Sequence, residues 1–96
     1  AELYEDLIGS RVEKCRTLQG WKDQDISVLE DGYRLANPAG HAVVRRALRN
    51  CRVLACDPHT VRLRDTGSDE HCTVALNRVE IGYDEQRQRK LLRVHP

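Results

Sequence analysis

The side chains best suited to chemistry in this sequence are its cysteines and histidines, and zinc binding is the chemistry they suggest. Cys56 and His59, in the stretch CDPH, have the separation of zinc ligands, and His71 with Cys72 would complete a four-ligand site. Residues 60–65 lie between the two pairs and alternate apolar with polar, which predicts a strand about 20 Å long. Zinc–ligand bonds measure only about 2.0 to 2.3 Å, so one ion cannot reach both pairs. We therefore expect no metal site.

The sequence supports a disulfide or a catalytic site no better than it supports a zinc site. Cys51 and Cys72 fall on predicted strands that flank 60–65, about 9 to 10 Å apart, which exceeds the reach of a disulfide. We expect the cysteines to be reduced thiols in the core. Ser68 and the polar residues 69–71 have the composition of a hairpin loop, and the dispersed glycines form no phosphate-binding loop. We expect a protein that is not an enzyme and has no cofactor.

The arginines are the remaining candidates for a functional surface. Thirteen of the sixteen basic residues are Arg, although the net charge is only +1. Guanidinium groups bind phosphate and carboxylate in a two-pronged geometry, so a local cluster would suit RNA or an acidic partner. The candidate basic patch consists of Arg45, Arg46, Arg49, Arg52, Arg62 and Arg64.

The length and composition predict one folded domain. Ninety-six residues, 40% of them hydrophobic and 32% charged, suffice for a single core. We expect one domain over residues 1–96, whether it stands alone or is a segment of a longer protein. No apolar run approaches the ~20 residues that span a bilayer, and the N-terminal stretch AELYEDLIGS lacks the segments of an export signal. We expect a cytoplasmic protein with no membrane partner.

The first third of the chain predicts a helix and then a hairpin. Residues 3–18 carry apolar side chains at helical spacing, although Gly9-Ser10 interrupts the pattern, and Trp21 begins a polar linker. Strands are predicted at 26–30 and 33–36, joined by a tight turn at Asp31-Gly32.

The next segment has two interpretations. Asn37 and Pro38 suit the first positions of a helix over 38–49. The alternative is a third strand through HAVVRRA.

Beyond residue 50 the apolar period becomes two, which predicts a sheet. Val61 and Leu63 are expected to face the core and to pair with Leu76 and Val74, with Arg62 on the opposite side. Residues 78–83 and an edge strand at 91–94 would form the last hairpin. The fold class is therefore α+β, with an antiparallel sheet of about five strands.

The stretch ISVLEDGYRLANPAG resembles the start of a PAS domain, whose first hairpin turns at an Asp-Gly and delivers an Asn to the next helix. Asp31, Gly32, Asn37, Pro38 and Ala39 carry this resemblance. Members of that family usually have several short helices at this point, where only one fits here. The resemblance implies two sets of functional residues, namely a dimerising helix face of Leu3, Leu7, Ile8 and Val12, and a ligand-binding or core sheet face of Tyr33, Leu35, Val74 and Leu76.

Two functional hypotheses follow. The first is a non-enzymatic, PAS-like sensory or interaction module in signalling or regulation, which dimerises through its N-terminal helix and binds a protein or small ligand on its sheet. The second is a small SH3-like or Sm-like β-barrel that acts in nucleic-acid binding or regulation through its arginines. Extended backbone from Ala42 to Leu48 would exclude the first hypothesis and favour the second.

Overall fold

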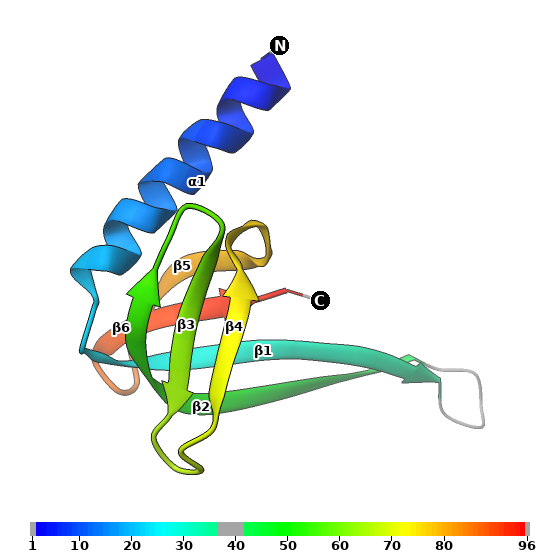
Figure 1. Ribbon diagram of the computed structural model, residues 1–96. Coiled ribbons are helices and arrows are strands. Elements are labelled where there is room, and N and C mark those ends of the chain that lie inside the picture. The colour runs from blue at the N-terminus through cyan, green and yellow to red at the C-terminus, as the bar shows by residue number, and fades with distance from the viewer. Residues whose placement is uncertain (1, 37–41, 96) are drawn as a thin grey trace.

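One helix is followed by a six-stranded sheet in the computed structural model, which describes residues 2–36 and 42–95 and, within them, the side chains of 11–31 and 47–95. The elements are α1 (Glu2–Gly20), β1 (Asp25–Ala36), β2 (Ala42–Cys56), β3 (Thr60–Asp65), β4 (His71–Ala75), the short 3-10 helix η1 (Leu76–Arg78), β5 (Val79–Asp84) and β6 (Arg89–Val94). The strand order is β4-β3-β2-β1-β6-β5, and every neighbouring pair is antiparallel except β1 and β6, which run parallel (Figure 1). The fold class α+β is confirmed. The sheet differs from the prediction of about five antiparallel strands, because it has six strands with one parallel pair, and it is an open sheet instead of the alternative β-barrel.

The predicted helix at 38–49 is wrong, because residues 42–56 form the longest strand of the sheet. Asn37, Pro38 and Ala39 lie outside the described residues. The apolar residues of this segment fit both a helical spacing and alternation, and Val43 and Val44 are β-branched, which favours a strand. The deciding influence is tertiary, since β2 pairs with β1 on one side and β3 on the other.

The predicted turn at Asp31-Gly32 is also wrong. Both residues lie within β1, so the two predicted strands at 26–30 and 33–36 are one continuous strand. Asp31 lies opposite Arg46 and Arg34 opposite Val44, so β1 has one residue more than β2 at this point. Such an extra residue is a β-bulge, where glycine is common. The chain between β1 and β2 falls at residues 37–41, outside the described part.

Three smaller predictions need correction. The helix α1 continues through Gly9 and Ser10, and Trp21 is buried in the core instead of lying in a linker. β6 lies between β1 and β5, so it is not an edge strand. The predicted strands of the C-terminal half are otherwise confirmed. The expected pairing of Val61 with Leu76 and of Leu63 with Val74 is wrong by two residues, because Val61 pairs with Val74, Leu63 pairs with Cys72 and Leu76 lies in η1.

One side of the bent sheet holds the hydrophobic core. In Figure 1 the β3–β4 pair lies across β5 and β6. The helix α1 runs down one side of this body, and the paired β1 and β2 extend away from it as a ribbon. Every strand contributes at least one buried residue to the core, together with the last turns of α1. The buried apolar residues are Cys15, Leu18, Trp21, Ile26, Val28, Cys51, Val53, Val61, Leu63, Val74, Leu76, Val79, Leu92 and Val94. No helix in the described part of the chain has the length and apolar character needed to cross a membrane.

The fold predicts that Leu63→Ala is strongly destabilising. Leu63 is completely buried at the centre of β3, so its truncation should lower the free energy of unfolding by about 2 to 5 kcal/mol. Urea denaturation followed by Trp21 fluorescence measures the change. Arg62→Ala, one residue away on the exposed face, is the control and should change the free energy by less than about 0.5 kcal/mol. Equal effects would contradict the assignment of faces in β3.

Candidate functional site

The side of the sheet opposite the core, which we call the outer face, carries the candidate site. The strand register shows which residues share it, because residues paired across neighbouring strands lie on the same side. Its members include Asp25, Ser27, Leu29 and Asp31 of β1, Leu48, Asn50, Arg52 and Ala55 of β2, Arg62 and Arg64 of β3, His71 and Thr73 of β4, Glu80, Gly82 and Asp84 of β5, and Arg89, Leu91 and Arg93 of β6.

Positive charge is concentrated along β2. Residues 32–56 contain Arg34, Arg45, Arg46, Arg49 and Arg52 and no acidic residue. This segment therefore carries a formal charge of +5, and the rest of the chain, to reach the total of +1, carries −4. The arginines of β2 run from Arg45 to Arg52, a length of about 23 Å at the rise of a strand. The near-neutral total conceals a basic strip through the middle of the sheet.

Where this strip enters the body of the sheet, Arg52 of β2 and two arginines of β3 form a row on the outer face. Arg52 of β2 lies beside Arg64 of β3, and Arg62 follows two residues along β3. Arg52 pairs with Asp25, their Nε and Oδ1 atoms 3.0 Å apart, and this hydrogen bond holds the pKa of Asp25 below its ordinary value. Arg64 pairs with the exposed Asp69 at 3.1 Å. Arg62 is exposed and makes no ion pair with the described residues.

A buried serine organises the neighbouring part of the face. Ser27 is fully buried, its hydroxyl donates to Asp84 Oδ2 at 2.6 Å, and it accepts a hydrogen bond from Arg89 Nε at 2.8 Å. The guanidinium of Arg89 also donates to Asn50 Oδ1. The hydroxyl of Ser27 and then the backbone N–H of Arg87 lower the pKa of Asp84. Arg89 is thus fixed in place by two neutral oxygen acceptors.

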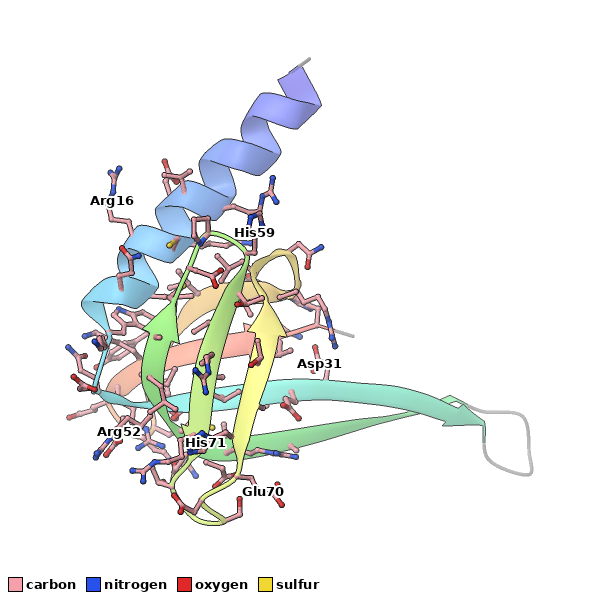
Figure 2. All side chains as sticks on the ribbon, viewed as in Figure 1. Arg16, Asp31, Arg52, His59, Glu70 and His71 are labelled. Carbon is pink, nitrogen blue, oxygen red and sulfur yellow. The ribbon has the colours of Figure 1, made fainter. Side chains whose placement is uncertain are left out.

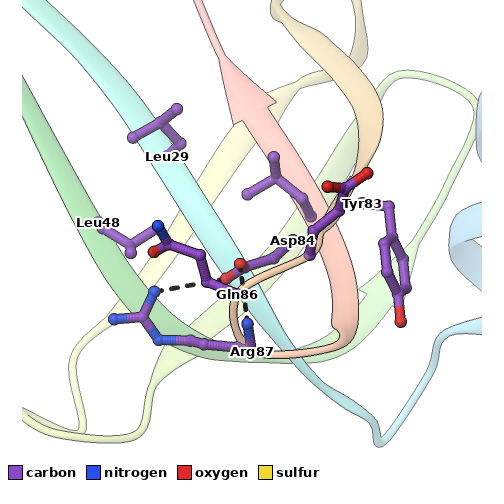
Figure 3. Close-up of a pocket in the computed structure, with 8 residues that line it drawn as sticks. Leu29, Leu48, Tyr83, Asp84, Gln86 and Arg87 are labelled. Atoms are coloured by element: carbon purple, nitrogen blue, oxygen red, sulfur yellow. Dashed lines mark hydrogen bonds and ion pairs between the residues drawn. The ribbon is translucent and has the colours of Figure 1, made fainter.

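Next to this network lies an apolar hollow of about 380 Å³ (Figure 3). Leu29, Leu48 and Leu91 line it from β1, β2 and β6, and residues 83–87, from the end of β5 and the β5–β6 turn, line the other side. The side chain of Leu48 is exposed even though it is large and apolar, with 44% of its surface accessible. Figure 3 shows the amide of Gln86 reaching from the turn toward the leucines. An exposed apolar floor beside polar groups is the usual composition of a binding site.

A second polar network closes the face on its other side. Arg93 pairs with Asp31 at 3.3 Å, and His95 lies 2.9 Å from Glu80 and 3.8 Å from Asp31. Asp84 of the Ser27 network lines the hollow, and Arg93 of this ion-paired group lies opposite Leu29 in the register.

The residues proposed from sequence are only partly brought together. Arg52, Arg62 and Arg64 share the outer face, whereas Arg49 lies opposite Val28 on the other face and pairs with Glu30 at 3.6 Å. Val74 and Leu76 are core residues. Val12 is 46% exposed on α1. The remaining proposed residues occupy α1, β1 or β2, but their side chains are outside the described part of the structure, namely Leu3, Leu7, Ile8, Tyr33, Leu35, Arg45 and Arg46.

All four cysteines are free thiols. The described residues include no cluster of three or more side chains that could hold a metal ion. Burial raises the pKa of Cys51 to about 11, and burial together with the neighbouring Cys15 raises that of Cys56 to about 12. These thiols are therefore neutral near pH 7, and the thiolate is the reactive form.

Sequence reasoning missed the hollow and the Ser27 network. Both depend on the parallel pairing of β1 with β6, which places Ser27 beside Leu91 although the residues are far apart in sequence. The available signal was the alternation in 26–31, which puts Ser27 and Leu29 on the same side. The absence of acidic residues over 32–56 was also visible in the sequence.

Comparisons of the chain with models of known protein families, with curated proteins and with solved structures found no match.

The Ser27 network predicts that Ser27→Ala destabilises the protein. The variant leaves Arg89 Nε and Asp84 Oδ2 without their shared partner, which should lower the free energy of unfolding by about 1 to 3 kcal/mol. Chemical denaturation at pH 7 measures this. Ser68→Ala, in the exposed β3–β4 loop, is the matched control and should have a much smaller effect. An unchanged unfolding midpoint for Ser27→Ala would contradict the network.

The lowered pKa of Asp84 predicts a loss of stability in acid. Its ionised form is favoured in the folded state, so its contribution is present above the ordinary pKa of 3.8 and disappears as the pH falls through the lower folded value. Asp84→Asn should therefore flatten the fall in unfolding free energy between about pH 5 and pH 2, measured by urea titrations. Glu85→Gln, which removes a carboxylate from the same turn, is the control. A pH profile equally steep in Asp84→Asn would refute this assignment.

Proposed function

We propose that this protein is a non-enzymatic module that binds single-stranded RNA along β2 and the outer face of its sheet. The observation that carries this proposal is the extended course of β2, a central strand with four arginines and no acidic residue. The PAS resemblance required a helix over part of the same segment. With residues 42–49 extended, that resemblance no longer supports a sensory module, and the nucleic-acid alternative takes its place.

The charge distribution suits a flexible polyanion. The ion pairs Arg52–Asp25 and Arg64–Asp69 are solvent-exposed, and exposed pairs are generally worth less than about 1 kcal/mol. A phosphate can therefore replace either carboxylate at small cost, and Arg62 offers its guanidinium directly. A single strand is favoured over an RNA duplex because the deep, narrow major groove of A-form RNA is closed to side chains, whereas an unpaired strand exposes both its bases and its phosphates.

RNA binding predicts a salt dependence and a matched pair of charge variants. If Arg52, Arg62 and Arg64 each contact one phosphate, the slope of log affinity against log salt is about −2, and affinity falls about 20-fold between 50 and 200 mM salt. Arg62→Glu should weaken binding about tenfold and reduce the slope by about 0.7. Fluorescence anisotropy with a labelled twelve-nucleotide single-stranded RNA measures both.

The control for this experiment is Arg16→Glu, which makes the same charge change on the exposed side of α1, away from the outer face (Figure 2). It should leave the affinity within about twofold of the original. Failure to bind at 50 mM salt, an affinity that does not respond to salt, or equal weakening by both variants would each overturn the proposal. Tighter binding to duplex than to single-stranded RNA would overturn the choice of substrate.

A further inference from the structure

We propose that the hollow beneath the β5–β6 turn receives one unstacked nucleobase of the bound strand. This inference rests on the proposed RNA binding and specifies what the outer face recognises besides phosphate. A base is a flat apolar surface with a polar edge, and single-stranded RNA is commonly recognised through bases turned out of the stack.

The floor and volume of the hollow match such a ligand. Three leucine side chains, Leu29, Leu48 and Leu91, supply an apolar surface, and the volume of about 380 Å³ lies within the usual range of about 300 to 1,000 Å³ for small-molecule sites. Gly82 lies opposite Leu91 in the register, so no side chain of β5 covers that leucine from the neighbouring position. The exposed Leu48 would lose contact with water when a base covers it.

The rim offers hydrogen bonds to the edge of a base. The side chain of Gln86 carries one donor group and one acceptor, makes no hydrogen bond with the described residues, and extends toward the leucine floor (Figure 3). Asp84 is already engaged by Ser27 and Arg87, so it holds the turn in position. Gln86 is therefore the residue that would contact the base edge.

The cations around the hollow favour a nucleotide as its occupant. Arg87, which lines the hollow, is paired with Asp84 at 3.4 Å, so the next cation, Arg89, is the one we assign to the phosphate. Arg89 is held at Asn50, two residues along β2 from Leu48 and about 7 Å away at the spacing of a strand. Arg52 follows two residues further on, in the row that contains Arg64. A base on Leu48 would thus place its own phosphate near Arg89 and the next phosphates toward Arg52. An apolar peptide side chain would fit the floor but would leave this row of cations unused.

The test compares a labelled twelve-nucleotide uridine RNA with an abasic ribose-phosphate strand of the same length, in fluorescence anisotropy titrations at 50 mM salt. Both strands carry the same phosphates, so the ratio of their affinities isolates the bases. We expect the intact strand to bind roughly tenfold more tightly. Leu48→Ser should reduce this ratio to about twofold or less without changing the salt slope.

Val12→Ser is the matched control, because Val12 on α1 is 46% exposed and Leu48 is 44% exposed. The ratio of affinities for the intact and the abasic strand should be the same for Val12→Ser as for the unmodified protein. The circular dichroism spectra of both variants should be unchanged. As a measurement that needs no variant, methyl NMR signals of Leu29, Leu48 and Leu91 should shift with the intact strand and not with the abasic one.

The outcomes separate the two proposals. Salt-dependent binding of equal strength to both strands would overturn the base site and leave RNA binding by the arginines intact. The same result is expected if the hollow serves a protein side chain instead. A preference for the intact strand that survives Leu48→Ser, without methyl shifts, would place the base elsewhere and overturn the inference. No binding of either strand would overturn the proposed function itself.

Discussion

The pairing of β2 with strands on both of its sides is the constraint on which the rest of the structure depends. One face of β2 supplies Cys51 and Val53 to the core, while the other places Leu48, Asn50 and Arg52 on the outer face. Because side chains alternate along a strand, a shift of one residue would bury the arginine and expose the apolar pair. The burial of Cys51 and Val53 therefore fixes the position of every functional side chain proposed on β2.

The sheet could be predicted from sequence wherever alternation coincided with burial. Val61 and Leu63 in β3 alternate with arginines, and no helical pattern competes with that interpretation. In residues 42–49 the apolar residues fit both periods, and Asn37-Pro38 suits either a helix start or a turn. Pairing with the distant strand β1 determines that this segment is extended, and residues 42–49 alone give no indication of that pairing. The turn predicted at Gly32 was wrong for a related reason, since a glycine suits a bulge as well as a turn.

The candidate site was harder to predict than the sheet, because its parts come from strands that are distant in sequence. The parallel contact of β6 with β1 brings Arg89 to Ser27, residues that are 62 positions apart. A serine at an alternating outward position predicts an exposed hydroxyl. Ser27 is buried instead, and its hydroxyl is hydrogen-bonded to the side chains of Arg89 and Asp84. Asp84 also lines the hollow, so the same end of β5 contributes to the Ser27 network and to the hollow.

The two kinds of arginine on the outer face differ in how firmly they are held, and this difference bears on recognition. Arg52 and Arg64 pair with exposed carboxylates, which phosphate can displace at little cost and in a salt-dependent way. Arg89 donates to the neutral acceptors Ser27 and Asn50 and makes no ion pair with the described residues, although Ser27 also links it to the carboxylate of Asp84. In the proposed complex, a loosely paired row would follow the flexible backbone of the RNA, while one fixed cation next to the apolar hollow would set the register of that backbone. The proposed arrangement would let a protein of net charge +1 hold RNA locally without strong attraction elsewhere.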